Sequence, residues 1–326
     1  MCTYCSKNKL NLSRRNFYRL DVSLILYFKY SPENNEGLCN QLMAFFRVIG
    51  ESLYFSKQGN KVGIIINDFQ TRNSSDIIDF DINFSKISFD AFVDLKELTQ
   101  LLSKENILVN LPENIDSTKQ DIVFCSRFLN RIMTSEENKE NGAFIANHFP
   151  FAKKVLTISN AIIDSMSSYS NWKAIHLRIE DELVNFHSDS TTDFEGYIEN
   201  QLLQAIDMIN TPDLSAVYIA AGIKEEKFNK IAQIFNDKLP NLFILNKLEV
   251  LKNQPSLLKQ LNDLSLEEQA LVDWLVCIGA PHFSGLHASS FAYLAGYIRH
   301  YRGFDKVTTQ LWPTYQPLWE LWFPRI

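Results

Sequence analysis

The sequence predicts an α/β protein built from two parallel-sheet domains that face each other across a cleft. Short apolar runs typical of buried strands alternate with amphipathic helical stretches along most of the chain. The 326 residues are enough for two such domains, and 46% hydrophobic with 21% charged residues is ordinary for a folded protein. We place the N-terminal domain at residues 1–160 and the C-terminal domain at residues 161–326.

The first half begins with a predicted strand over residues 22–30, followed by a polar loop and a helix. That helix repeats apolar residues at the spacing of one buried face: Leu42, Phe45, Phe46, Ile49 and Leu53. Two further strands are expected over residues 62–66 and 107–111. Residues 67–86 are polar and predict an exposed excursion, while a charged loop over 136–141 precedes a helix over 149–166.

The second half continues the alternation. Strands are expected over 174–177, 216–220 and 242–245, with helices over 195–209 and 224–235. Ser265 and Glu268 form a capping box that opens another helix, which buries Leu271, Trp274, Leu275 and Ile278. An apolar turn over 277–283 and a small-residue loop lead to a last helix. The tail carries Trp312, Trp319 and Trp322 and is predicted to strap over the core, packing back on the first domain, with a ligand-binding aromatic platform as the alternative.

Charge and cysteine content exclude some classes of function. A net charge of −6 without a long basic block argues against nucleic acid as a partner. The CxxC formed by Cys2 and Cys5 has no second pair at zinc-site spacing, so no metal is expected. Residues 1–19 lack the apolar core of a secretion signal and the run over 22–28 is too short to cross a bilayer. We expect no membrane span and a cytoplasmic location, or a secretory one if a leader has been removed.

Candidate functional residues lie where predicted strands pass into loops and helices. They are Gly37 and Asn40 after the first strand, His176 and Arg178 after the strand over 174–177, and Ser289 and Ser290 before the last helix. Open α/β sheets bind ligands at such places. The first turn of a helix offers unpaired N–H groups and a positive dipole end. This arrangement predicts a site for a nucleoside diphosphate.

Taken in order, these segments resemble the motifs of the GDP-fucose protein O-fucosyltransferase superfamily. Gly37-Leu38-Cys39-Asn40-Gln41 resembles its N-terminal loop, His176-Leu177-Arg178 its His-x-Arg strand end, and Val272-Asp273 with Phe283-x-Gly285 and Ser289-Ser290-Phe291 its nucleotide segment. The element over 218–222 and the plant-like Glu180 agree with it. The resemblance covers residues 22–303. It implies the GT-B fold of two Rossmann-like domains and a GDP-fucose donor, with no cofactor and no metal.

The implied reaction is inverting, metal-independent transfer of fucose to a protein or glycan hydroxyl. Arg178 suits the β-phosphate because its planar guanidinium can grip two oxygens; the alternative is a salt bridge to Glu180 or Asp181. Ser289 and Ser290 would hold the phosphates, or merely cap their helix.

The remaining candidates address the base and the sugar. Asp273 would accept hydrogen bonds from guanine, or be a solvated helix acid. His176 would stack on or bond the nucleoside, or be a core histidine satisfied by backbone. Phe291 is assigned to the nucleotide site by the resemblance. Asn40 would bond the donor's phosphate or sugar, or be a simple N-cap.

The acceptor hydroxyl has to lose a proton. Glu36, beside Gly37, is the first candidate base and Glu180 the second, against the alternative of a solvated loop acid. The DxD sequence at Asp79 and Asp81 lies in the polar excursion with no strand end to present it, so we interpret it as coincidental.

Three other readings of the whole chain stay open. The same fold could use another deoxysugar nucleotide of the rhamnose type. It could also be a non-catalytic nucleotide-sugar-binding protein, because Leu38-Cys39 and Ala280-Pro281 depart from the family pattern. Finally, the chain could be some other α/β sugar-binding protein.

Overall fold

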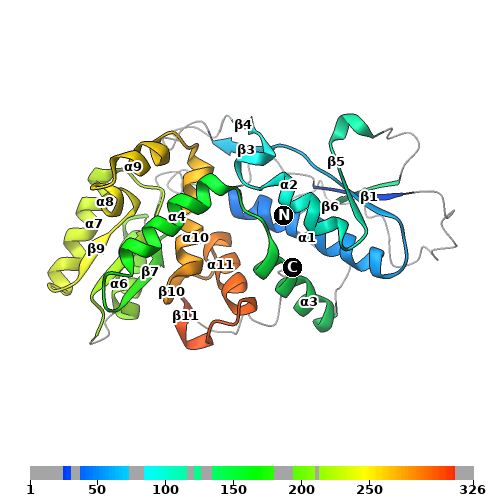
Figure 1. The fold of residues 1–326 in the computed structure, drawn as a ribbon. Coiled ribbons are helices and arrows are strands. Elements are labelled where there is room, and N and C mark those ends of the chain that lie inside the picture. The colour runs from blue at the N-terminus through cyan, green and yellow to red at the C-terminus, as the bar shows by residue number, and fades with distance from the viewer. Residues whose placement is uncertain are drawn as a thin grey trace.

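The computed structural model describes residues 25–30, 37–72, 84–115, 121–125, 134–179, 194–209 and 213–312. It contains two parallel sheets, one from each half of the chain, with helices packed around and between them (Figure 1). The prediction of an α/β fold with two parallel sheets is therefore confirmed. Residue 160, the predicted domain boundary, lies inside a helix, and the position of the boundary stays a prediction.

The N-terminal sheet has the order β5-β2-β1-β6, and all its neighbours are parallel. Its strands are β1 (Leu26–Tyr30), β2 (Val62–Ile65), β5 (Ile107–Asn110) and β6 (Asp121–Cys125). Helices α1 (Leu38–Lys57) and α2 (Leu95–Ser103) connect them. A separate antiparallel ribbon pairs β3 (Phe69–Arg72) with β4 (Phe84–Ile87).

The C-terminal sheet has the order β11-β10-β7-β8-β9 and is also parallel throughout. Its strands are β7 (Trp172–His176), β8 (Ala216–Ala220), β9 (Phe243–Leu245), β10 (His282–Leu286) and β11 (Thr309–Trp312). The chain builds outward from β7 to β9, then returns to the other side of β7 through β10. This reversal makes the junction of β7 and β10 a topological switch point, where the carboxyl ends of neighbouring strands leave a crevice.

Helices cover both faces of the C-terminal sheet and fill the space between the two halves. They are α3 (Ser135–His148), α4 (Lys153–Met166), α6 (Phe194–Ile209), α7 (Glu225–Lys238), α8 (Lys247–Leu251), α9 (Pro255–Asn262), α10 (Leu266–Gly279) and α11 (Ser290–Tyr301). Short 3₁₀ turns cover Phe89–Ala91, Pro112–Asn114 and Lys306–Thr308.

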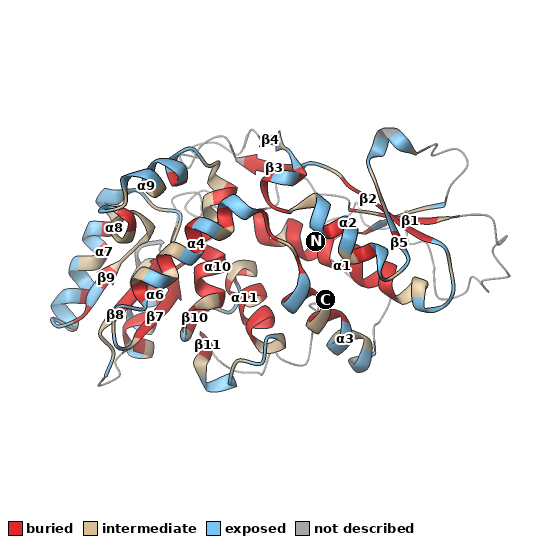
Figure 2. Ribbon diagram, in the orientation of Figure 1, coloured by how far each residue is buried: buried red, intermediate tan, exposed pale blue. Residues whose placement is uncertain are grey.

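Helix α10 lies at the centre of the molecule and is buried over most of its length (Figure 2). The predicted capping box of Ser265 and Glu268 opens it, as the local sequence requires. A single hydrophobic cluster joins it to the N-terminal half, and the Phe151 and Trp274 rings meet edge-on at 5.7 Å. The Thr71 hydroxyl also donates to buried Glu267 at 2.5 Å. The two sheets therefore share a continuous core.

Several local predictions were wrong. Residues 136–141 are not a loop but part of α3, which Thr134 and Glu137 open with their own capping box. The predicted excursion over 67–86 is exposed at Asp68, Ser85 and Lys86, but Phe69 and Thr71 in β3 are buried. The apolar turn over 277–283 is the end of α10 and the start of β10. Trp312, which we expected in a strap over the core, is instead a buried residue of strand β11.

Some predictions fall outside the described residues: those on Cys2 and Cys5, on Asp79 and Asp81, and on the tail after Trp312. Within the described ranges, no helix combines the length and the apolar character needed to cross a bilayer.

Candidate functional site

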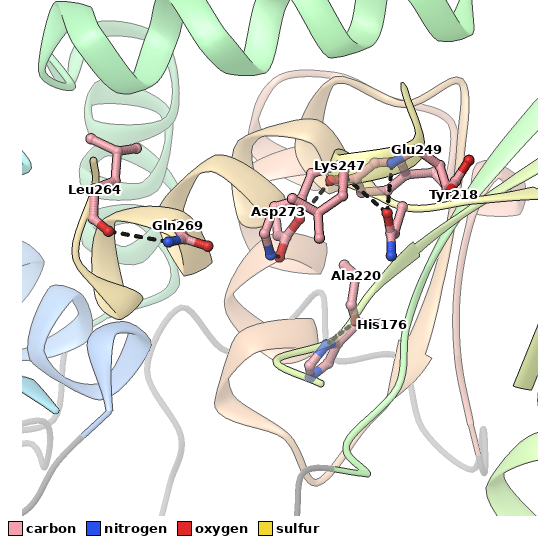
Figure 3. A network of polar contacts seen from close by, with 10 residues as sticks. His176, Tyr218, Ala220, Lys247, Glu249, Leu264, Gln269 and Asp273 are labelled. Atoms are coloured by element: carbon pink, nitrogen blue, oxygen red, sulfur yellow. Dashed lines mark hydrogen bonds and ion pairs between the residues drawn. The ribbon is translucent and has the colours of Figure 1, made fainter. Parts of the chain in front are cut away.

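The site is organised around His176, the last residue of β7, at the switch point between β7 and β10. Its Nδ1 lies 3.1 Å from the Ala220 carbonyl oxygen at the end of β8 (Figure 3). Its Nε2 lies 3.0 Å from the Ser289 hydroxyl, and its ring stacks on Phe291 with centroids 4.1 Å apart. Because a carbonyl only accepts, Nδ1 carries the proton, and a neutral ring accepts from Ser289 at Nε2. The fold thus brings buried His176 and Ser289 and partly buried Phe291 into one cluster.

The start of α11 is shaped for close approach to this cluster. Ser289 is the N-cap residue, but its side chain makes no capping bond and contacts His176 instead, so the hydroxyl does not serve as a helix cap. Ser290, half-buried, is the first residue of the helix. A Cβ at Gly285 would lie 2.6 Å from the Ala292 Cβ and 3.4 Å from the His176 Cβ. The absence of a side chain at Gly285 therefore lets β10, α11 and β7 pack closely where the two strands end.

Arg178 follows β7 as a half-buried residue between Leu177 and Ile179, whose side chains are fully buried. Burial raises the pKa of the Cys39 thiol strongly, and the positive charge of Arg178 acts in the opposite direction on that pKa. Cys39 lies in the first turn of α1, in the other half of the chain. Arg178 therefore lies close enough to the start of α1 for its charge to be felt there.

The first turn of α1 presents the N-terminal motif. Gly37 is the N-cap, with φ −66° and ψ 162°, and Asn40 is inside the helix with its N–H bonded to the Gly37 carbonyl at 3.0 Å. Asn40 is half-buried and is not the N-cap, which removes that alternative. Glu36, the predicted base, and Glu180, its fallback, lie outside the described residues.

Gln41 is a structural residue of this motif that the sequence reasoning did not assign. It is fully buried. Its Oε1 accepts from the Tyr30 hydroxyl and from the Gln70 N–H, each at 2.8 Å, while its Nε2 donates to the Gln70 carbonyl at 2.9 Å. Gln41 thus ties α1 to β1 and β3. Its place in the Gly37–Gln41 motif was the signal that could have indicated it.

Asp273 is not a solvated helix acid. Its carboxylate accepts from the Tyr218 hydroxyl at 2.5 Å and pairs with Lys247 at 2.6 Å (Figure 3). Burial, and then the charge of Asp273, raise the pKa of Tyr218. Each carboxylate oxygen accepts one of these bonds and keeps a second lone pair. Contact between Asp273 and a guanine base stays a prediction.

The described residues contain no group of three or more His, Cys, Asp and Glu side chains placed to hold a metal ion.

Comparison with known proteins decides the family. The sequence profile of the family described as GDP-fucose protein O-fucosyltransferase matches residues 56–302, more than half of the chain. The protein belongs to this family. It is therefore a member of a glycosyltransferase family, as the resemblance implied. The match begins inside α1, after the Gly37–Gln41 segment, so that segment is not part of it. No curated protein matches the sequence.

Solved structures give the fold. POFUT1 in complex with GDP, and POFUT1 in complex with GDP-fucose, each superpose with a TM-score of 0.50 at 10% identity, covering 89% of this chain and 98% of that chain. NodZ alpha-1,6-fucosyltransferase co-crystallised with GDP has a TM-score of 0.47 at 12% identity and covers 84% of this chain and 91% of that chain. The likeness to POFUT1 confirms the predicted GT-B fold.

Proposed function

We propose that the protein transfers fucose from GDP-fucose to a hydroxyl group of a protein or glycan acceptor, with inversion at the anomeric carbon and without a metal ion. One observation carries the proposal. At the switch point of the C-terminal sheet, the His176–Ser289–Phe291 cluster adjoins Arg178, whose charge reaches the start of α1 in the other half. Family membership and the GDP-fucose complex of POFUT1 support the donor.

The diphosphate is proposed to bind at the start of α11. The first-turn N–H groups of a helix have no partners within it and lie at its positive end, which suits an anion. Ser290 is the first residue of that helix and would add its hydroxyl there, while the Ser289 hydroxyl contacts His176. The planar guanidinium of Arg178 can donate to two phosphate oxygens at once. Asn40 would approach the donor from α1, on the opposite side.

In the reaction, the acceptor oxygen attacks C1 of fucose and forms the new glycosidic bond. The bond between C1 and the β-phosphate oxygen breaks, and its electron pair leaves with GDP. Arg178 and the helix N-terminus stabilise that developing charge, which is where fixed donors contribute most to the rate. The acceptor proton goes to a base, for which Glu36 is proposed and Glu180 is the fallback, or to water. Attack from the face opposite the leaving group inverts C1.

The donor is tested by calorimetry with GDP, UDP, CDP and ADP in the presence of EDTA, together with release of GDP from GDP-fucose. Tight binding of GDP alone and slow GDP release support the proposal. A preference for UDP would point to a rhamnose-type donor, and GDP binding without any turnover to a non-catalytic protein.

The role of Arg178 is tested with Arg178→Ala and Arg178→Lys. Removing one donor to a developing charge typically costs roughly 10²–10³-fold in turnover. We expect that loss for alanine and a smaller one for lysine, which keeps the charge but loses the paired geometry. Full activity of Arg178→Ala would remove the centre of the proposal.

A further inference from the structure

The backbone of Arg178 is held by a buried side chain that belongs to neither strand nor motif. Gln201, in α6, is only 3% exposed. Its Oε1 accepts from the Arg178 N–H at 3.0 Å, and its Nε2 donates to the Arg178 carbonyl at 2.7 Å. A side-chain amide has the same donor and acceptor as a peptide group. Gln201 therefore bonds to Arg178 as a neighbouring strand would, at the point where β7 has ended.

We infer that Gln201 is a positioning residue, which fixes the main chain of Arg178 so that its guanidinium meets the diphosphate. This inference rests on the proposed function. Helix α6 packs through Leu202, Ala205 and Ile206 on the same cluster that buries Leu177 and Ile179. The Arg178 backbone is thus pinned by Gln201, while the flanking side chains are locked in the core.

A second contact holds the next peptide. Lys227, in α7, donates from Nζ to the Ile179 carbonyl at 2.6 Å. On the other side, the Leu177 N–H donates to the Ala220 carbonyl at 3.1 Å, the same oxygen that His176 contacts. Two helices and one strand therefore restrain the residues around Arg178. Within residues 176–179, Arg178 is the one that is not buried.

An apolar residue of similar size would fill the space of Gln201, but it would leave the partly buried Arg178 N–H and carbonyl without these two bonds. A buried peptide group that loses its partners is costly and shifts to regain them. Small displacements of a positioned catalytic group reduce rates sharply, on the order of 10²-fold for 1 Å. The amide is therefore expected to matter more for turnover than for folding.

Three variants test this. Gln201→Leu removes both bonds, and Gln201→Glu keeps the acceptor but turns a carboxylate toward the Arg178 carbonyl. Gln204→Leu is a matched control one turn away on α6, where the glutamine donates to the Asn200 side chain in an exposed contact. For GDP release from GDP-fucose, we expect roughly a 10- to 100-fold lower kcat/KM in Gln201→Leu, carried mainly by kcat, and wild-type values in Gln204→Leu.

The pH profile separates positioning from general damage. Burial and the facing carbonyl favour the protonated carboxyl in Gln201→Glu, which can donate to the Arg178 carbonyl again. Its activity relative to wild type should therefore rise as pH falls from 8.5 to 5.5, whereas the ratio for Gln201→Leu should stay flat. If the activities of wild type, Gln201→Leu and Gln201→Glu all change with pH in the same way, the inference is overturned.

A double-mutant cycle on GDP affinity supplies the second test. If Gln201 acts through Arg178, Gln201→Leu weakens GDP binding in the wild-type background and has no further effect in Arg178→Ala. Equal effects in both backgrounds would overturn the inference while leaving the proposed function intact. If the wild-type protein neither binds GDP nor releases it from GDP-fucose, the proposed function itself fails.

Discussion

Removing Lys247 should destabilise the protein because it leaves a buried carboxylate without its counter-charge. The Asp273 side chain is 6% exposed and that of Lys247 is 13% exposed, with 2.6 Å between their charged atoms. In Lys247→Met, Asp273 keeps only the Tyr218 hydroxyl of these two partners. Breaking a buried ion pair from one side costs about 3–5 kcal/mol. Because Lys247 retains some contact with water, we expect the lower end, about 3 kcal/mol.

The measurement is the free energy of unfolding in urea, from the midpoint and slope of the transition. Lys252→Met is the matched control, because Lys252 pairs at 2.9 Å with Glu249 near the same helix but has a side chain 61% exposed. An exposed pair contributes at most about 1 kcal/mol. Replacing the whole group with apolar side chains, as Lys247→Met with Asp273→Leu and Tyr218→Phe, should recover most of the loss, because no buried polar group of this contact is then left without a partner. If Lys247→Met costs no more than Lys252→Met, the ion pair is not the buried contact inferred from the structure.

Two further predictions concern buried cations. Arg299→Met should lower the free energy of unfolding by about 4 kcal/mol. The fully buried guanidinium donates to the Ile278 and Ala280 carbonyls, at the end of α10, at 2.9 and 2.5 Å. A melting temperature no lower than that of Arg302→Met would contradict this. Burial lowers the pKa of Lys173 from 10.5 to about 8. Between about pH 8 and pH 10.5, Lys173 is protonated in the unfolded chain but not in the folded protein. The free energy of unfolding should therefore rise with pH over this range, by roughly 3 kcal/mol in total relative to Lys173→Met. The free energy of unfolding is measured in urea at several pH values. If it changes with pH equally in wild type and in Lys173→Met, Lys173 is not desolvated.

Local patterns predicted the elements whose sequences decide their own structure. The strand over 216–220 is apolar throughout and coincides with β8, and the capping box of Ser265 sets the start of α10. Strand β10 was missed because His282-Phe-Ser-Gly-Leu286 carries no β-branched residue, and pairing with β7 and β11 on either side stabilises it instead. Helix α3 was missed because its polar sequence is typical of a loop, whereas its packing against α11 favours the helix.

The sequence by itself determined the type and order of most elements and the chemical groups at their ends, because strand periodicity, caps and apolar spacing act over a few residues. It also carried enough of the family's motifs to indicate the fold. Only the tertiary structure decided which of those groups meet. His176 contacts Ser289, which is 113 residues away in the sequence, and Gln201 hydrogen-bonds to the backbone of Arg178, which is 23 residues away. Such contacts depend on strand order and helix packing, which no local pattern encodes.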